Sequence, residues 1–390
     1  CSWTRPSMAT LFTSLYMDAH QVYYDCAQKE PGKGSSDALP LSLDTLAELL
    51  KANGYRTAGL QTNGNLTQKL GFAQGFDSYE YLSNAPAGQL TDAALKTLDT
   101  LGGKGPRFLY VHYLDPHLPY TPPDSYRTLL GWPLALSPEE TATVTDFMPY
   151  FRDYLEYITG MQPAPKFPPL SETAHEAVRL LYDGEVRYND DEVRRLMASL
   201  RKRLPNALVI VTADHGEHLW DHKFVSHVMT LYDTLTRVPL IVNGPGVAPG
   251  RTDKPVGLVD LMPSIAERAG IPAAPWWQGR SIFGDIPADR VLFSHTEANS
   301  PRYNLSLEMA QQGTLKLIMN RKKENADELY DLATDPGELN NIIDQRPEDA
   351  EKFRKLINTH RLANIKARRS AQEKVVLDAE TLKHQRDLGY

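Results

Sequence analysis

The residues best suited to chemistry lie in one stretch, Thr212 to His227, which reads TADHGEHLWDHKFVSH. Asp214 and His215 are adjacent in it, and three more histidines follow within the same sixteen residues. The stretch comes directly after an apolar run at 208–211, which predicts a buried strand. A carboxylate and an imidazole at the carboxyl end of a buried strand can point into one crevice and bind a divalent metal ion. The pattern therefore predicts a metal site at Asp214 and His215.

A second group with chemical potential opens the chain, in the segment CSWTRPSMATLFTS. Pro6 is typical of the first turn of a helix, and the apolar residues Met8, Leu11 and Phe12 predict that the helix continues. Thr4 then lies at or just before the amino end of this helix. A hydroxyl there faces free backbone N–H groups and the positive end of the helix dipole, which favour a bound anion and an alkoxide. Two roles stay open for Thr4 at this point, a nucleophile or a capping residue.

Helices and strands alternate through the region that carries these groups. The patterns predict helices capped by Ser42 and running over 43–52, and over 171–204, around 229–235 and over 258–269. Short apolar runs predict buried strands at 55–61, 108–111, 208–211 and 238–242. This alternation is typical of a mostly parallel sheet covered by helices on both faces, where ligands bind beyond the carboxyl ends of the strands. His112 and His117 also fall at such an end.

Two further regions differ from this alternation. Residues 122–169 are rich in Pro, Tyr and Thr, and we expect an irregular surface insertion there that forms part of a pocket wall. After residue 287, short strand patterns at 291–294, 314–320 and 329–331 precede a charged helix at 347–369. We therefore predict a large α/β domain over 1–287 and a small α+β domain with an antiparallel sheet over 288–390.

Composition limits the classes of partner. The 390 residues are 41% apolar, which is enough for a large core, and the formal charge of −7 is spread without long runs of one sign. We therefore expect no nucleic acid and no anionic membrane surface as the main partner. No apolar stretch is long enough to cross a membrane, and the two cysteines, Cys1 and Cys26, do not discriminate between redox compartments. Oligomeric state is not indicated.

Several motifs occur in order along the chain: the opening segment, DHGE at 214–217, YDTLTRVPLIV at 232–242, VDLMPS at 259–264, ELYDLATDPGELNN from Glu328 and the closing LGY at 388–390. Taken together, they resemble the sulfatase family of the alkaline phosphatase superfamily. The resemblance implies an α/β domain with a large mixed, mostly parallel sheet between helices, carrying catalysis over 1–287, and a small carboxyl-terminal domain with an antiparallel sheet.

The resemblance also implies a nucleophile. The family has a Cys, Ser or Thr ahead of a Pro-Ser segment and a helix bearing Leu-x-Thr-Gly, and only Thr4, not Cys1, places the following residues in register. Met8 then stands where the family has Arg. Relatives with a threonine nucleophile are mostly phosphodiesterases or phosphotransferases, whereas a formylglycine matured from cysteine marks sulfatases. We therefore expect a metal-dependent ester hydrolase or phosphotransferase with a covalent intermediate on Thr4 and a preference for phosphoesters. A true sulfatase and a non-catalytic relative that binds sulfated or phosphorylated glycans are the alternatives.

Residue by residue, the resemblance implies that Asp214, His215 and the Thr4 oxygen bind one divalent metal ion: Ca²⁺, Mn²⁺, Zn²⁺ or Mg²⁺. It implies that His117, His222 and His227 contact the ester group or help the leaving group. For His112 and His218 we expect structural roles. The expected substrate is a small-molecule, glycan or lipid-headgroup ester.

One family feature is missing ahead of Thr4. The family begins with a strand that ends in acidic metal ligands, and no such segment precedes Cys1. Either the natural protein carries this strand before residue 1 or the metal site is incomplete. We expect the former, since a sheet without its central strand would leave buried backbone groups unpaired. A signal or membrane anchor in that segment would imply an extracytoplasmic location.

Overall fold

The structure is a computed structural model of the chain. It describes residues 1–23, 27–28, 34–102, 105–132, 134–158, 161–227, 230–299, 304–378, 381 and 383. The expected LGY motif at 388–390 lies outside these residues. Among the described helices, none combines the length and the apolar composition that a membrane crossing requires.

Strands of the large α/β part form two groups. β3 (Arg56–Gln61) pairs in parallel with β4 (Ser78–Tyr81) on one side and with β5 (Arg107–His112) on the other. β6 (Val209–Thr212) pairs antiparallel with β9 (Leu240–Asn243). The four predicted strands are therefore present within two residues of their predicted ends, and they show both the parallel and the antiparallel pairing of the predicted mixed architecture. β4, whose SYEY sequence carries no apolar run, was not predicted.

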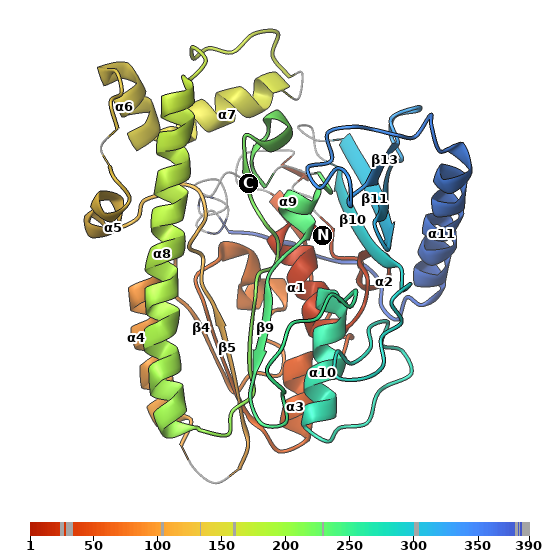
Figure 1. Cartoon of the computed structure of the whole chain (residues 1–390). Helices are drawn as coiled ribbons and strands as arrows, with labels where there is room; N and C mark the ends of the chain where they lie inside the picture. Colours follow the sequence, from red (N-terminus) through yellow and green to blue (C-terminus); the bar gives the residue numbers. More distant parts are fainter. Residues whose placement is uncertain are drawn as a thin grey trace.

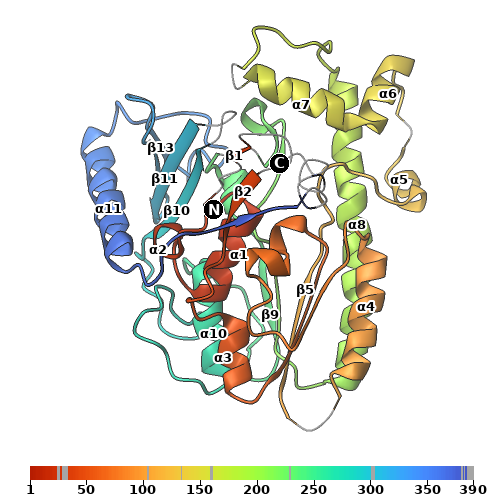
Figure 2. The ribbon, with the colours of Figure 1, turned by 180° about the vertical axis from the view of Figure 1, so that it is seen from behind.

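Helices lie on both sides of these strands (Figures 1 and 2). α4 (Ala87–Thr100) and the long α8 (Glu172–Arg203) pack together on one side, while α1 (Thr4–Thr13), α3 (Leu46–Ala52) and α10 (Leu261–Arg268) lie on the other. The large core joins α1 and α3 to the strands through apolar side chains such as Phe12, Leu46 and Phe72. Burial of these side chains supplies the main driving force that holds the layers together.

Helix α3 begins three residues later than predicted. The expected cap was Ser42, but Thr45 is the N-cap, and its Oγ1 accepts a hydrogen bond of 3.3 Å from Glu48 N. Glu48 Oε2 in turn accepts from Thr45 N at 2.9 Å. This reciprocal pair is a capping box, which satisfies two free N–H groups where a serine alone satisfies one.

The prediction of an irregular insertion at 122–169 was wrong. The segment contains α5 (Asp124–Leu129), α6 (Pro138–Thr145) and α7 (Phe147–Ile158). Ser137 caps α6 through a second capping box with Glu140. A separate apolar core explains why the segment folds, since aromatic residues of α7 pack against α8; its members include Phe147, Tyr150, Phe151, Val178 and Leu181.

The carboxyl-terminal part is an antiparallel sheet in the order β10 (Leu292–Asn299), β11 (Asn304–Gln312), β12 (Leu315–Asn320) and β13 (Glu328–Asp331). α11 (Pro347–Lys366) packs on it through Phe353 and Ile357. The antiparallel sheet and this helix were predicted. β11 was not, although its sequence NLSLEMAQQ alternates polar residues with Leu305, Leu307 and Met309, a pattern typical of a strand with one apolar face.

The chain then returns to the amino-terminal part. β14 (Glu373–Val376) pairs antiparallel with β2 (Gly34–Ala38), which also pairs with β1 (Ala27–Gln28) (Figure 2). The remaining short elements are α2 (Met17–His20), β7 (His218–Leu219), β8 (Val225–Ser226) and α9 (Asp233–Thr236). A helix was predicted around 229–235, and the structure contains α9 at its carboxyl end. Residues 228 and 229 are not described.

Two buried clusters of charge join the carboxyl-terminal sheet to the α/β part. In the first, Lys316 of β12 is fully buried, and its Nζ lies 2.7 Å from Asp233 Oδ1 of α9 and 2.7 Å from Glu338 Oε1. A buried ammonium requires such partners because its transfer out of water is costly. The contact ties the sheet to the helix that follows the histidine-rich segment.

In the second cluster, His295 of β10 lies between two carboxylates. Its Nδ1 is 3.4 Å from Asp18 Oδ2 of α2, and its Nε2 is 3.4 Å from Glu297 Oε2. Burial alone would lower the pKa of His295, but Asp18 and Glu297 outweigh burial and raise the pKa to about 9. Nearby Glu308 pairs with the guanidinium of Arg361 at 2.8 Å. The imidazole is therefore a cation at neutral pH.

We predict that Lys316→Met lowers the free energy of unfolding by about 3–5 kcal/mol, because it leaves the buried Glu338 carboxylate and the half-buried Asp233 carboxylate without their cation. Urea denaturation followed by circular dichroism measures this change. Lys355→Met is the matched control: its ammonium forms a surface pair with Glu351 at 3.7 Å, and its removal is expected to cost less than about 1 kcal/mol. Equal effects of the two substitutions would contradict the prediction.

We also predict a loss of stability in alkaline solution that depends on His295. Its folded-state pKa of about 9 lies above the ordinary value of 6.5, so its stabilisation is complete below pH 6.5 and is lost as the pH rises through 9. The largest effect is about 3 kcal/mol. In His295→Gln the decline of stability between these pH values should disappear, whereas His175→Gln, whose imidazole stacks on Trp220, should retain it. An unchanged decline in His295→Gln would rule the explanation out.

Candidate active site

Thr4 is the first residue of α1 and is 1% exposed. The N-cap is Trp3, so Thr4 does not have the capping role that the sequence left open. Its Oγ1 lies 3.3 Å from His215 Nε2 and 3.4 Å from Asn63 Nδ2. The hydroxyl therefore meets the segment after β6, 211 positions away in the chain, and the turn after β3.

Asp214 and His215 follow β6 directly, as predicted. His215 Nδ1 donates a hydrogen bond of 2.8 Å to Gly216 O. A neutral imidazole protonated at Nδ1 presents a lone pair at Nε2, and this is the atom that faces Thr4. Burial lowers the pKa of His215, which favours that neutral form.

The Asp214 carboxylate is the charged group next to this lone pair. Its Oδ2 lies 3.6 Å from His215 Nε2. Burial would raise the pKa of Asp214, but the His215 and His112 imidazoles and the Thr4 hydroxyl outweigh burial, and the pKa falls to about 2. Asp214 Oδ2 is buried and has no hydrogen-bond partner among the described residues. An ionised oxygen without a donor, beside an imidazole lone pair and a hydroxyl oxygen, fits a bound divalent cation.

His227 lies next to the same group. Its ring centroid is 4.5 Å from that of His215 and 4.8 Å from that of His117. Its Nδ1 is 3.2 Å from Glu217 Oε2, and Tyr120 donates to Glu217 Oε1 at 2.6 Å. His215, Glu217 and His227 offer ligand atoms within 4.8 Å of one another. His215 could therefore bind a metal ion together with Glu217 and His227 as well as with Asp214 and Thr4.

His117 completes the cluster from the loop after β5. Its Nδ1 donates to Leu118 O at 2.6 Å, and its backbone N–H donates to Glu185 Oε2 of α8 at 3.2 Å. Burial and, to a smaller extent, neighbouring His227 lower the pKa of His117 to about 4. The fold thus brings together Thr4, Asp214, His215, His117 and His227.

The other histidines lie in different surroundings. His218 bonds Thr230 Oγ1 at 2.8 Å and Thr234 Oγ1 at 3.2 Å, which is the satisfied structural setting expected for it. His222 stacks on Tyr232 with ring centroids 3.7 Å apart, and the described contacts do not join it to Thr4 or Asp214. Its predicted catalytic role stays a prediction. His112 ends β5, and its charge influences Asp214.

Sequence reasoning missed three residues of this site: Asn63, Tyr120 and Glu217. Glu217 belongs to the DHGE motif, and Tyr120 follows His117 in PHLPY, so the sequence places both residues close to predicted site residues. Only the fold shows that the carboxylate joins the phenol to His227. Asn63 carries no motif signal at all, because its importance comes from a contact with a residue 59 positions away.

Gly216 sets the path of the metal-site segment. Its N–H donates to Leu235 O of α9 at 2.9 Å, and a Cβ at this position would lie 1.9 Å from Thr234 O. No side chain fits so close to a backbone oxygen, so the close approach requires glycine. This contact fixes the backbone position of Gly216, and with it the positions of the adjacent His215 and Glu217.

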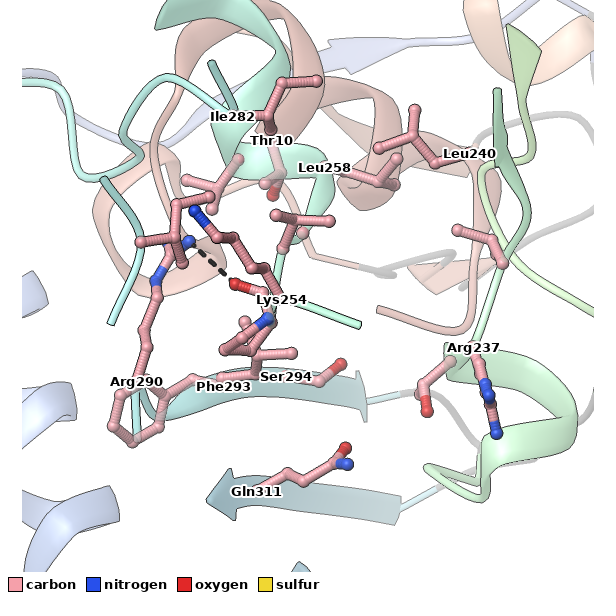
Figure 3. A pocket seen from close by; sticks show the side chains of 18 of the residues that line it. Thr10, Arg237, Leu240, Lys254, Leu258, Ile282, Arg290, Phe293, Ser294 and Gln311 are labelled. Atoms are coloured by element: carbon pink, nitrogen blue, oxygen red, sulfur yellow. Dashed lines mark hydrogen bonds between the residues drawn. The ribbon is translucent and has the colours of Figure 1, made fainter. Parts of the chain in front are cut away.

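A cavity of about 1370 Å³ adjoins the site, and Asp214 and Cys1 are among its lining residues. Figure 3 shows part of this cavity between Leu240 of β9 and Phe293 of β10, with Lys254 extending into it. Arg290 in the same view is held by Asp260 at 2.7 and 2.8 Å and donates to Pro255 O at 3.2 Å. Of Thr4, Asp214, His215, His117 and His227, Asp214 is the one that lines this cavity.

Comparisons with known proteins agree on one family. The family model described as Sulfatase matches residues 1–271, and the model described as N-sulphoglucosamine sulphohydrolase, C-terminal, matches residues 216–367. The chain is 27% identical over 303 residues to arylsulfatase K of Mus musculus, covering 69% of this chain and 53% of that protein. It is 31% identical over 160 residues to the uncharacterized sulfatase YidJ of Escherichia coli K12, covering 40% and 32%. The chain thus spans about a third to a half of these relatives.

Solved structures show the same fold. One was determined in complex with its substrate D-glucosamine-2-N,6-O-disulfate; the match covers 93% of this chain and 88% of that one, with a TM-score of 0.70 and 19% identity. The phosphonate monoester hydrolase of Agrobacterium radiobacter matches with a TM-score of 0.70 and 18% identity, covering 93% and 86%. These likenesses confirm the predicted fold.

We predict that Gly216→Ala lowers turnover by about 10²-fold, because the new methyl group must displace the backbone that places His215. Steady-state kinetics with the ester that the protein cleaves, together with calorimetric titration of the metal ion, measures the effect. Gly284→Ala is the control, since a Cβ there meets Ser281 O at an ordinary 3.5 Å. Wild-type turnover in Gly216→Ala would show that the close approach is not needed.

Proposed function

Because the chain belongs to the sulfatase family of the alkaline phosphatase superfamily, we propose that it is a metal-dependent ester hydrolase in which Thr4 is the nucleophile. The observation that carries this proposal is the position of Thr4 Oγ1, 3.3 Å from His215 Nε2 and beside the Asp214 carboxylate. A hydroxyl at the amino end of a helix, next to a cation-binding group, is suited to ionise and attack an anionic ester.

Cys1 is the competing nucleophile, since family members mature a cysteine to formylglycine. In the structure Cys1 packs against the small apolar cluster of Trp3 and Ala298. Thr4, by contrast, contacts His215 and Asn63. The geometry therefore supports Thr4.

We assign each side chain of the site a separate role in the reaction. Asp214, His215 and Thr4 Oγ1 would hold the metal ion, and its charge would favour the ionised form of the hydroxyl. Thr4 Oγ1 forms a bond to sulfur or phosphorus, and the bond from that atom to the alcohol oxygen breaks. His117 and His227, whose ring centroids lie 4.8 Å apart, are placed to contact the ester group, and one of them, in its protonated form, to donate to the leaving oxygen. Water then cleaves the Thr4 ester.

For the substrate we propose a sulfate ester first, because the curated relatives named above are sulfatases. The large cavity beside Asp214 would accept a glycan or another bulky alcohol. A phosphate or phosphonate ester is the second candidate. It is favoured by the threonine hydroxyl, which needs no maturation, and by the shared fold of the phosphonate monoester hydrolase.

We predict that Thr4→Ala lowers kcat by about 10³-fold or more, whereas Thr4→Ser, which keeps a hydroxyl, retains part of it. The measurement is a parallel assay of aryl sulfate, phosphate monoester and phosphate diester, with the chelated protein reloaded with Ca²⁺, Mg²⁺, Mn²⁺ or Zn²⁺. Cys1→Ala is the control and should keep its turnover.

Three outcomes would change the proposal. Loss of activity in Cys1→Ala but not in Thr4→Ala, with an aldehyde at Cys1 by intact mass, would identify a formylglycine sulfatase. No cleavage of any ester with any metal ion, alongside binding of sulfated glycans, would identify a non-catalytic relative. Fastest cleavage of a phosphoester would reverse the order of the two substrate classes.

A further inference from the structure

The turn after β3 is polar although it is buried. Gln61 and Thr62 are fully buried, and Asn63 and Asn65 are 1% and 3% exposed. Buried amide and hydroxyl groups are costly unless each is hydrogen-bonded, so a turn of this composition needs a reason. Apolar residues could fill the same space at less cost.

Hydrogen bonds hold the Asn63 side chain in one orientation. Its Oδ1 accepts from Asn65 N at 2.8 Å, which caps the short 3-10 helix at 64–66, and its backbone N–H donates to Gln61 Oε1 at 2.6 Å. Asn65 is fixed in turn by Arg5, whose Nη2 donates to Asn65 Oδ1 at 2.7 Å. Because Oδ1 already serves a backbone N–H, a flip of the amide would lose that bond.

This orientation directs the Asn63 Nδ2 donor to Thr4 Oγ1, at 3.4 Å. The Asp214 carboxylate near the same hydroxyl opposes a second negative charge on Oγ1. An amide N–H stabilises that charge, adds no charge of its own and keeps its protons. A fixed donor aimed at a developing oxyanion in a buried site acts mainly in the transition state.

We propose that Asn63 is a further catalytic residue of this site: its amide donates to Thr4 Oγ1 and stabilises that oxygen as it becomes the nucleophile. The inference rests on the proposed function. The Thr4 proton is released to water, the Oγ1 lone pair forms the bond to sulfur or phosphorus, and the electron pair of the broken bond leaves with the alcohol oxygen. Asn63 changes neither its protonation nor its covalent bonds.

The alternative is that Asn63 acts only as the cap of the 64–66 turn. Asn63→Asp separates the two roles, because aspartate caps as well as asparagine, has the same shape and replaces the donor by an anionic oxygen. We expect kcat to fall by about 10²-fold or more in the folded variant. Asn53→Asp is the control, since Asn53 is exposed and its Nδ2 donates to Leu49 O of its own helix; its kcat should equal that of the wild type.

The experiment measures kcat and the pre-steady-state burst with the best ester in the wild type, in Asn63→Asp and in Asn63→Ser, which keeps a capping hydroxyl should the first variant unfold. The same substitutions are made in Thr4→Ala. A donor to Oγ1 predicts a slower burst in the Thr4 background and no further loss in the Thr4→Ala background. Equal losses in both backgrounds, or a kcat within about threefold of the wild type, would overturn the role of Asn63. Full activity of Thr4→Ala would overturn the proposed function itself, which is a distinguishable result.

Discussion

The contact between Thr4 Oγ1 and His215 Nε2 is the interaction around which the rest of the molecule is arranged. It joins the first turn of α1 to the segment after β6. The approach is possible because Gly216 allows the backbone to lie against Thr234 O, and because α1 is buried along almost its whole length. A nucleophile and a cation-binding pair must be placed within a fraction of an ångström, and rigid elements achieve this better than loops.

The carboxyl-terminal sheet supports both elements through buried charge. Asp18 of α2, which follows α1, pairs with His295 of β10, and Asp233 of α9, which holds Gly216 in place, pairs with Lys316 of β12. Apolar contacts tolerate small shifts, whereas a buried ion pair loses much of its stabilising energy when the distance or angle between its groups changes. The second part of the chain thus sets the relative position of the two segments that meet at Thr4, without contributing the predicted site residues.

The chemistry around Thr4 depends on groups that are neutral or held in one state. His215 presents an Nε2 lone pair because its Nδ1 serves Gly216 O, and Asp214 is held ionised with one oxygen lacking a donor. Asn63 adds a donor without charge. Such an environment would leave the positive charge of the site to a bound metal ion and to the amino end of α1, both next to the proposed nucleophile.

The sequence alone determined the local features: the strands with continuous apolar runs, the long helix α8, the start of α1 at Thr4 and the DHGE segment after a strand. These follow from composition and periodicity over a few residues, and so could be predicted. Tertiary structure decided the rest. The helices at 124–158 form because their aromatic face finds α8, and Asn63, Tyr120 and Glu217 join the site only through contacts that span from 10 to 97 positions of the chain. His222 and His227 show the same limit: they lie five residues apart in one motif, yet one stacks on Tyr232 and the other lies beside His215, because the fold of the turn between them, not their spacing, directs the two rings.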